Sequence, residues 1–521
     1  MLMHDFVIRN ARRFPNRTAL VCRAENVRYT WKEYNARVNK LANGLASLGV
    51  KKDDRVGVVM GRNCHRIMEM YFACAKLGAA TLPVNPRLHP KEIAYILNDG
   101  EPVVLCVDVN MVDSIAPIKE SLKSVKTFIG IGDSHPYEED YEDLVARSDD
   151  TEPQVDVKED DTFLLLYTSG TTGNPKGVML THKNEVTEHT NQLAVDRDVK
   201  MCDVVAAHCP LFHIAPVAFW DFHLFFGATL VISTFNGSDP EAFLKDIVDE
   251  KSNSAFLIPS MWKVVLAHPN IGKYDLSCVH VAGYGGAPMP SALVEEAMKR
   301  MPKAKWVGHF GQTETGPDIA YVWPKDHYPG SKYLDSVGHE PWLTETKIVD
   351  DDDNELPPGK IGEICARGDN IMKGYWKMPE ETAETLRGGW CHTGDLGYKD
   401  EEGYLWLTDR KKDIIISGGE NISSVQVESV ISKLPGILDV AVIGVPDEKW
   451  GETPKAIVSL RPGAELTEEQ IIEHCKKNLA SFKKPTSVEF TENLPKTASG
   501  KVRKNELREK YWKGYEKRIQ G

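Results

Sequence analysis

Short apolar runs alternate with amphipathic segments through most of the first 320 residues. Runs typical of buried strands lie at 20–22, 56–60, 103–107, 163–167, 204–207, 229–232, 255–258, 279–282 and 306–310. Between them, residues 31–48 and 240–250 repeat apolar side chains at the three- and four-residue spacing of an amphipathic helix. Strands that alternate with helices form parallel sheets with helices on both faces, so we expect two doubly wound α/β subdomains here.

The pattern changes after residue 337. Strands are expected at 346–349 and 362–366, with an acidic turn and a Pro-Pro-Gly segment between them. This spacing is typical of an antiparallel sheet or barrel, so we expect a β-barrel-like subdomain to complete a large N-terminal domain. After the charged linker 409–413, the pattern predicts a small α+β domain with helices at 425–434 and 468–479 and strands at 440–445, 456–460 and 487–490.

Charge and composition narrow the possible functions. The 521 residues hold 63 Lys and Arg against 76 Asp and Glu, a net charge of −13, which disfavours a nucleic-acid-binding protein. Residues 412–521 are mildly basic by comparison, with 18 Lys and Arg against 16 Asp and Glu. This difference has two interpretations: an ordinary solvated surface, or a small domain that closes over a phosphate-rich ligand.

The sequence also indicates where the protein works. Its ten cysteines are scattered without a Cys-x-x-Cys pair, which is typical of reduced thiols in a cytoplasmic protein. The start of the chain has no apolar core of a signal peptide. The most apolar stretch, 210–232, is interrupted by His213, Asp221 and His223, so we expect a buried segment and no membrane insertion.

One glycine-rich loop is suited to binding an anion. Residues 167–177 read Tyr-Thr-Ser-Gly-Thr-Thr-Gly-Asn-Pro-Lys-Gly, between an expected strand and a helix that would start near Thr181. Backbone N–H groups, hydroxyls and the charge of Lys176 together suit a phosphate. The segment is not a Walker A loop, because Lys176 is followed by glycine where that motif has Ser or Thr.

This loop resembles the phosphate loop of the adenylate-forming superfamily, which includes acyl- and aryl-CoA synthetases, peptide-synthetase adenylation domains and luciferases. Further segments match that family in order and spacing over most of the chain. They are 285–288, 310–316, 367–375, 392–395, 409–422 and 495–501. The resemblance implies a hinge at 410–413, with Lys412 as the hinge residue, between an N-terminal domain 1–409 and a mobile C-terminal lid domain 414–521.

The resemblance also implies a nucleotide site. ATP would be bound by the loop residues Thr168, Ser169, Gly170, Thr171, Thr172, Gly173 and Lys176, and by Gly286, Ala287, Pro288, Phe310, Gly311, Gln312 and Thr313. Phe310 offers a flat face for adenine, and Glu314 is the type of oxygen ligand that Mg²⁺ prefers. Asp395 and Arg410 would contact the ribose.

Other matched residues are assigned to the acid and to coenzyme A. Lys501 would enter the site during adenylation and offset the repulsion between two anions. Gly418 and Gly419 would line the pantetheine tunnel, and Trp450, Phe482 and Lys484 would hold coenzyme A. His213 falls at the aromatic gate beside the carboxylate, and Ile214 replaces the aspartate that binds an amino group in amino-acid-activating relatives.

The acyl pocket is expected to be formed by 213–220, 282–286 and 308–311, which are mostly apolar. The resemblance therefore predicts an ATP-dependent acid:CoA ligase that activates an apolar carboxylic acid, fatty, alicyclic or aromatic. Three alternatives stay open: an acyl-AMP ligase that loads a carrier protein, a luciferase-like oxygenase, and a catalytically silent nucleotide-binding protein. The sequence does not fix the oligomeric state, for which a homodimer is a candidate.

Overall fold

The computed structural model describes residues 1–168, 175–195, 198–235, 237, 239–410, 413–417, 420–447, 449–497 and 501–513. The chain divides into two compact units. Unit 1 comprises Met1–Thr346 and Ala366–Cys391, and unit 2 comprises Lys347–Cys365 and His392–Gly521. These units differ from the domain bounds expected from sequence, which remain a prediction together with the hinge at 410–413. Lys412 lies outside the described residues.

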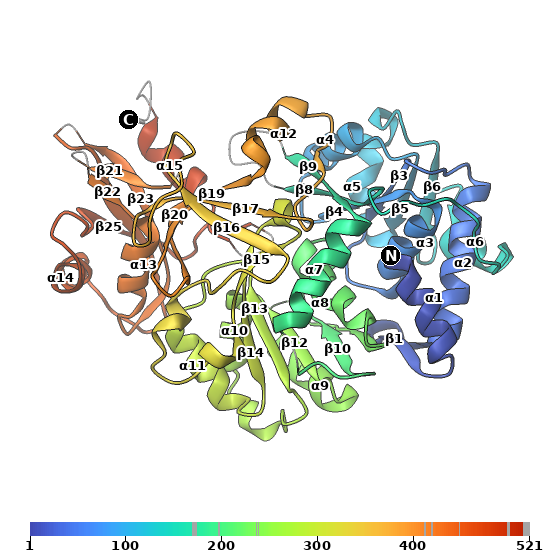
Figure 1. The fold of residues 1–521 in the computed structure, drawn as a ribbon, viewed down its shortest axis with the longest axis horizontal. Helices are drawn as coiled ribbons and strands as arrows, with labels where there is room; N and C mark the ends of the chain where they lie inside the picture. Colours follow the sequence, from blue (N-terminus) through green and yellow to red (C-terminus); the bar gives the residue numbers. More distant parts are fainter. Residues whose placement is uncertain are drawn as a thin grey trace. The chain divides into compact units, whose positions relative to one another are not determined.

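One large sheet of unit 1 is parallel through its centre. Its strand order is β15 (Asp318–Val322), β14 (Lys305–Gly311), β13 (Val281–Gly285), β12 (Ser254–Leu257), β10 (Val204–Ala207), β11 (Thr229–Ile232), β1 (Thr18–Cys22) and β2 (Val27–Thr30). The two edge strands, β15 and β2, are antiparallel to their neighbours. Figure 1 shows β12, β13 and β14 side by side in yellow-green.

The second large sheet of unit 1 contains the glycine-rich loop. Its strand order is β18 (Gly374–Tyr375), β9 (Lys176–Thr181), β8 (Thr162–Thr168), β4 (Ala80–Val84), β3 (Arg55–Val59), β5 (Val104–Asp108), β6 (Thr127–Ile131) and β7 (Glu139–Asp140). Strands β8 and β9 are antiparallel, and β18 is antiparallel to β9. The expectation of parallel sheets therefore holds for the centres of both sheets and for the β7 edge of the second. It is wrong at both edges of the first sheet and at the β18–β9–β8 edge of the second.

Some helices of unit 1 begin at a side-chain cap, of which α2 is the clearest case. The side chain of Thr30 accepts from the N–H of Glu33, and the Glu33 carboxylate accepts from the N–H of Thr30, which fixes the start of α2. The helices are α1 (Met3–Arg13), α2 (Trp31–Ser47), α3 (His65–Leu77), α4 (Pro90–Gly100), α5 (Val112–Ile115), α6 (Tyr141–Arg147), α7 (His182–Val195), α8 (Ile214–Leu224), α9 (Pro240–Glu250), α10 (Pro259–Leu266), α11 (Ser291–Arg300) and α12 (Pro379–Thr385).

The core of unit 1 joins elements that belong to both large sheets. The ring of Phe72 on α3 lies 6.3 Å from that of Phe163 on β8 and 5.9 Å from that of Trp220 on α8, measured between centroids. All three side chains are buried. Helices α7 and α8 pack against each other and lie side by side in green in Figure 1. Among the described residues, no helix is long and apolar enough to span a membrane.

The region expected to be barrel-like forms a sheet in the order β16 (Thr344–Val349), β17 (Gly362–Gly368), β19 (Cys391–Lys399) and β20 (Leu405–Arg410). The rest of unit 2 is a mixed α/β fold. Its sheet has the order β22 (Glu420–Ile422), β21 (Ile415–Ser417), β24 (Gly451–Leu460) and β23 (Ile437–Asp447), with β25 (Ser487–Phe490) beside β24. The helices are α13 (Ser424–Ser432), α14 (Glu468–Asn478) and α15 (Lys504–Trp512).

Candidate active site

The glycine-rich loop connects two antiparallel strands. Thr168 at the end of β8 is paired in register with Lys176 at the start of β9, so the loop closes a hairpin. The helix expected after the loop does begin at His182, but β9 lies between. The predicted loop residues Ser169, Gly170, Thr171, Thr172 and Gly173 lie outside the described residues.

Lys176 and Glu314 are brought to the two sides of one tyrosine. The ammonium of Lys176 lies 4.9 Å from the ring centroid of Tyr375, and the hydroxyl of Tyr375 donates to Oε1 of Glu314 over 3.0 Å. Strand β18 holds Tyr375 beside β9, where Tyr375 pairs with Val178. The backbone N–H of Met372 donates to the carbonyl of Glu314 over 3.0 Å. A cation, an aromatic face and a carboxylate therefore meet at the end of the loop hairpin.

Tyr375 was not among the residues singled out from the sequence. It is the last residue of the family-like segment 367–375, and its place in that segment was the available signal. Burial, together with the neighbouring charge and hydrogen bond of Glu314, raises the pKa of Tyr375 well above its usual range. The hydroxyl therefore stays protonated at neutral pH and remains a hydrogen-bond donor to the carboxylate.

The expected adenine site follows the carboxyl ends of β13 and β14, where open α/β sheets bind ligands. Gly285 pairs with His309 across these parallel strands, so 286–288 and Phe310 leave neighbouring strands at the same edge. Gly286 has φ +77°, a conformation that favours glycine. A Cβ on Gly311 would lie 2.0 Å from the carbonyl oxygen of Pro317, so only glycine fits there.

The turn that holds Glu314 is fixed by hydrogen bonds of the Thr315 hydroxyl, which belongs to the same turn. The N–H of Gln312 donates to Oγ1 of Thr315 over 3.0 Å, and that hydroxyl donates to the carbonyl of Pro317 over 2.8 Å. Thr315 is fully buried, whereas Gln312, Thr313 and Glu314 are half-buried. The turn thus presents three polar side chains from a rigid support.

The two residues expected to contact ribose are cross-strand partners in unit 2. Asp395 on β19 pairs in register with Arg410 on β20. The N–H of Asp395 donates to Oγ1 of Thr393 over 3.1 Å, and the N–H of Gly394 donates to Oε1 of Glu363 over 3.0 Å. Asp395 is buried. The pairing brings the backbones of Asp395 and Arg410 next to each other.

The predicted coenzyme A residues present aromatic surface in unit 2. Trp450 is 48% exposed with the Lys449 ammonium 4.5 Å from its ring centroid, and Phe482 is 43% exposed with Lys483 at 5.8 Å. Lys484 is half-buried. Gly418 and Gly419 fall between paired Ser417 and Glu420 and lie outside the described residues.

Lys501 is exposed. It is the first described residue after the gap that follows Thr497. Its N–H donates to Oγ1 of Thr497 over 3.1 Å, and its carbonyl accepts from the N–H of Thr497 over 2.7 Å. Lys496 and Val502 form a β-bridge on either side. These contacts fix the backbone at Lys501 and leave its side chain at the surface of unit 2.

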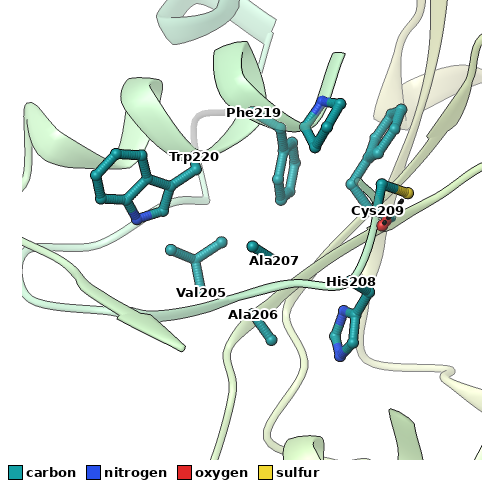
Figure 2. Close-up of a pocket in the computed structure, with 9 residues that line it drawn as sticks. Val205, Ala206, Ala207, His208, Cys209, Phe219 and Trp220 are labelled. Carbon is teal, nitrogen blue, oxygen red and sulfur yellow. Dashed lines mark hydrogen bonds between the residues drawn. The ribbon is translucent and has the colours of Figure 1, made fainter. Parts of the chain in front are cut away.

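A small cavity lies between α8 and β10. Figure 2 shows Phe219 and Trp220 on α8 pointing toward Val205 and Ala207, while His208 points to the other face. The cavity has a volume of about 10 Å³, close to the room that one water molecule needs. It is lined by Val205, Ala206, Ala207, His208, Cys209, Pro216, Phe219, Trp220 and Phe256. Of the expected acyl pocket, the segment 213–220 therefore contributes to an apolar cavity.

Aromatic rings continue from this cavity toward β14. Phe256 lies 5.4 Å from Phe219 and 5.4 Å from His309, between ring centroids. Nδ1 of His309 is 2.8 Å from a carboxylate oxygen of Asp318, which fixes the ring. His213, at the N-terminus of α8, is half-buried, with its ring 4.5 Å from that of Phe212.

Comparison with known proteins gives consistent matches. The AMP-binding enzyme model matches residues 7–376, and the model of the AMP-binding enzyme C-terminal domain matches residues 426–501. A feruloyl-CoA synthase of an Amycolatopsis species is 36% identical over 97% of this chain and 98% of its own. A long-chain-fatty-acid–CoA ligase of Mycobacterium tuberculosis is 35% identical over 95% and 96%.

A solved structure extends the match to three dimensions. The anthranilate CoA ligase AuaEII, solved with anthranoyl-AMP, superposes with a TM-score of 0.90 at 28% identity, over 98% of this chain and 97% of its own. Sequence motifs, family models and fold agree over most of the chain. The chain belongs to the AMP-binding enzyme family, within the adenylate-forming superfamily.

Proposed function

We propose that this protein is an AMP-forming acyl-CoA synthetase, which converts a carboxylic acid, ATP and coenzyme A into an acyl-CoA thioester, AMP and pyrophosphate. The arrangement of Lys176, Tyr375 and Glu314 at the end of the loop hairpin is the main observation behind the proposal. A cation and a carboxylate beside this hairpin support a phosphate site at the glycine-rich loop with Glu314 as a metal ligand.

In the first step, a carboxylate oxygen of the acid attacks the α-phosphorus of ATP, and the bond to pyrophosphate breaks. Lys176, Thr171 and Thr172 would bind the leaving pyrophosphate, and Thr313 the α-phosphate. The half-buried Glu314, with one oxygen fixed by Tyr375, fits Mg²⁺ as a hard oxygen ligand. The ion, when bound there, would neutralise part of the phosphate charge. Phe310 and 286–288 would hold adenine, and Asp395 with Arg410 the ribose.

Lys501 would supply the charge that the first step needs most. Two anions approach each other in that step, so a cation between them lowers the barrier. In the second step, the thiolate of coenzyme A attacks the acyl carbon, and AMP leaves. Trp450, Phe482 and Lys484 would hold coenzyme A, with Gly418 and Gly419 near the pantetheine. The superfamily resemblance implies that the lid containing Lys501 moves between the two steps.

We propose further that the preferred acid contains a planar ring. The cavity beside α8 has room for about one water molecule and would have to widen to admit an acid. Phe219 and Phe256 line it, and His309 packs against Phe256. Edge and face contacts with these rings suit an aromatic acid better than a long flexible chain, which loses more conformational entropy on binding. The names feruloyl-CoA synthase and anthranilate CoA ligase among the relatives agree with this choice.

The test is pyrophosphate release from ATP with benzoic, cinnamic, octanoic and palmitic acids, each with and without coenzyme A. We expect release with the aromatic acids and a thioester only when coenzyme A is added. A thioester formed on a phosphopantetheine carrier protein, and not on coenzyme A, would favour the carrier-loading alternative. Oxygen uptake with the acyl-adenylate would favour the oxygenase, and no pyrophosphate release with any acid would contradict the proposal. A cytoplasmic location and a homodimer are further proposals, which fractionation and light scattering test.

A further inference from the structure

Three ionisable side chains converge in the interior of unit 1, apart from the residues assigned above. Glu185 and His189 lie one turn apart on α7, and Asp221 lies on α8, which packs against α7. Each residue has one possible ligand atom, a carboxylate oxygen or a ring nitrogen, and these three atoms all lie within 4.8 Å of one another. None of the three has any solvent-exposed surface.

None of these ligand atoms has a hydrogen-bond partner within the described residues. This holds for both oxygens of Glu185, both oxygens of Asp221 and both ring nitrogens of His189. A buried polar group without a partner costs free energy, and a buried charge costs more. Burial accordingly raises the pKa of Glu185 to about 8 and lowers that of His189 to about 3. Burial and the nearby Glu185 raise the pKa of Asp221 well above its usual range.

Another buried carboxylate of the same unit shows how such a group is normally satisfied. Glu69 is also fully buried, but it accepts hydrogen bonds from Arg37 at 2.9 Å and from Tyr141 at 2.8 Å, and it lies 2.8 Å from His65. Burial alone would raise the pKa of Glu69, yet the charges of His65 and Arg37 lower it to about 2. The Glu185 cluster has a neutral histidine where Glu69 has cations.

We propose that Glu185, His189 and Asp221 bind one divalent transition-metal ion, of the Zn²⁺ type, in the interior between α7 and α8. Two carboxylates and a divalent cation sum to zero charge, so the ion would remove the burial cost of both acids. One nitrogen and two oxygens form a ligand set common for such ions, with a water at the remaining position.

The geometry requires only small movements. Ligand atoms around a tetrahedral zinc ion lie about 3.3 Å apart, given metal–ligand distances of about 2.0–2.2 Å. The three ligand atoms now lie within 4.8 Å of one another. Rotation of their side chains, on helices that are already packed together, would bring them to the shorter separation of a zinc site. Because Glu185 and His189 are four residues apart on one helix, they face Asp221 from one side.

The ion would have a structural role next to the proposed active site. Helix α7 follows β9, which begins at Lys176, and α8 contains Phe219 and Trp220 of the cavity. Metal–ligand bonds between α7 and α8 would therefore fix the helix that follows the loop hairpin relative to the helix that lines the cavity. The proposal does not depend on which acid or acceptor the enzyme uses.

Metal analysis of the purified chain tests the proposal. The protein is produced with added Zn²⁺ or Co²⁺, purified without nucleotide in a buffer that contains EDTA, and analysed by elemental mass spectrometry. We expect about one metal ion per chain, a visible d–d absorption band for the Co²⁺ form, and at least about tenfold less metal in Glu185→Gln and Asp221→Asn. Glu188→Gln is the matched control, because Glu188 is a buried acid on α7 outside the cluster, and it should retain the metal.

Circular dichroism establishes that each variant is folded. Wild-type protein with less than about one tenth of a metal ion per chain would overturn the proposal, whether or not the variants fold. Equal metal contents in wild type and folded Glu185→Gln would overturn it as well. In either case the two acids are protonated and water-bound, and Glu185→Gln should then be at least as stable as wild type. Failure of pyrophosphate release with intact metal content would count against the proposed function alone.

Discussion

The two units of the molecule hold their candidate functional residues in different ways. In unit 1, Lys176 lies over the ring of Tyr375, and Glu314 accepts a hydrogen bond from the hydroxyl of the same tyrosine. Gly311 lies so close to neighbouring backbone that no side chain could replace its hydrogen. In unit 2, Lys501, Trp450 and Phe482 are exposed. The candidate residues of unit 1 are therefore held by surrounding contacts. The proposed function requires the exposed groups of unit 2 to be covered by a ligand when they act.

Unit 1 contains a buried ionic network in which Arg37, His65 and Tyr141 surround Glu69, and Arg66 binds both Glu25 and Glu142. Such a network fixes helices but is costly to break, because removal of one charge leaves its partners buried and unpaired. The predictions below change one unit at a time, from the largest expected effect to the smallest.

Glu69→Gln should destabilise unit 1 by about 3–5 kcal/mol, because it leaves the guanidinium of Arg37 and the ring of His65 without their buried counter-charge. The pKa of Glu69 is lowered to about 2 from 4.5, so its contribution is present above pH 4.5 and is lost as the pH falls toward 2. Urea unfolding from pH 7 to pH 3 measures both effects. Glu138→Gln, which removes only the exposed pair with Lys119, should cost about 0–1 kcal/mol.

Lys501→Ala should lower the rate of acyl-adenylate formation by about 10²–10³-fold, as loss of one preorganised charge at a reacting centre does. Thioester formation from supplied acyl-AMP should change little, because the family resemblance places Lys501 out of the site in that step. Single-turnover rates of the two half-reactions give the comparison. Equal losses in both steps would exclude the assigned role, and Lys496→Ala on the same segment serves as control.

Tyr375→Phe should lower kcat/KM for ATP by about tenfold, the loss of about 1.5 kcal/mol typical of a hydrogen bond to a charged group. It should also raise the Mg²⁺ concentration needed for half-maximal rate, since Glu314 loses the donor that orients it. The measurement is pyrophosphate release as a function of Mg²⁺ and ATP. Tyr398→Phe, a hydroxyl removed from β19, should leave both unchanged; an unchanged Mg²⁺ dependence in Tyr375→Phe would show that Tyr375 does not position Glu314.

Trp450→Ala and Phe482→Ala should each raise KM for coenzyme A by about fivefold, near the lower end of the 1–3 kcal/mol that stacking of a base on an aromatic ring contributes. KM for ATP and the adenylation rate should stay the same. Trp342→Ala is the control, because Trp342 is 72% exposed in unit 1. If all three variants behave alike, the two aromatic residues of unit 2 do not bind coenzyme A.

The apolar pattern predicted most elements where local sequence determines structure. Strands β10, β11 and β25 and helix α9 have the expected bounds. Strand β13 begins at Val281 and not at residue 279, and β9 was not expected at all. Lys176–Thr181 is a short apolar run directly before a helix, and a single sequence gives no sign that such a run pairs with the strand before it. Both strands lie inside their sheets, β13 between β12 and β14 and β9 between β18 and β8, so their bounds depend on partners that a local pattern does not show.

The chemistry of the site was also largely predictable. The adenylate-forming resemblance is confirmed by the family models and the fold. The role of each site residue remains a prediction. Asp395 and Arg410, which the sequence proposed for the ribose, are cross-strand neighbours, and their role stays a prediction. The sequence motif that contains Tyr375 gave no reason to choose this residue over its neighbours.

The sequence alone therefore determined the family, the alternation of strands and helices, and the residue types at the phosphate loop, because these depend on local pattern and short motifs. Only the tertiary structure decided that Tyr375 stands between Lys176 and Glu314, since the three come from segments far apart in the chain. The same is true of the burial of Glu185, His189 and Asp221. Charged residues are normally exposed, and only the packing of α7 against α8 removes these three from water.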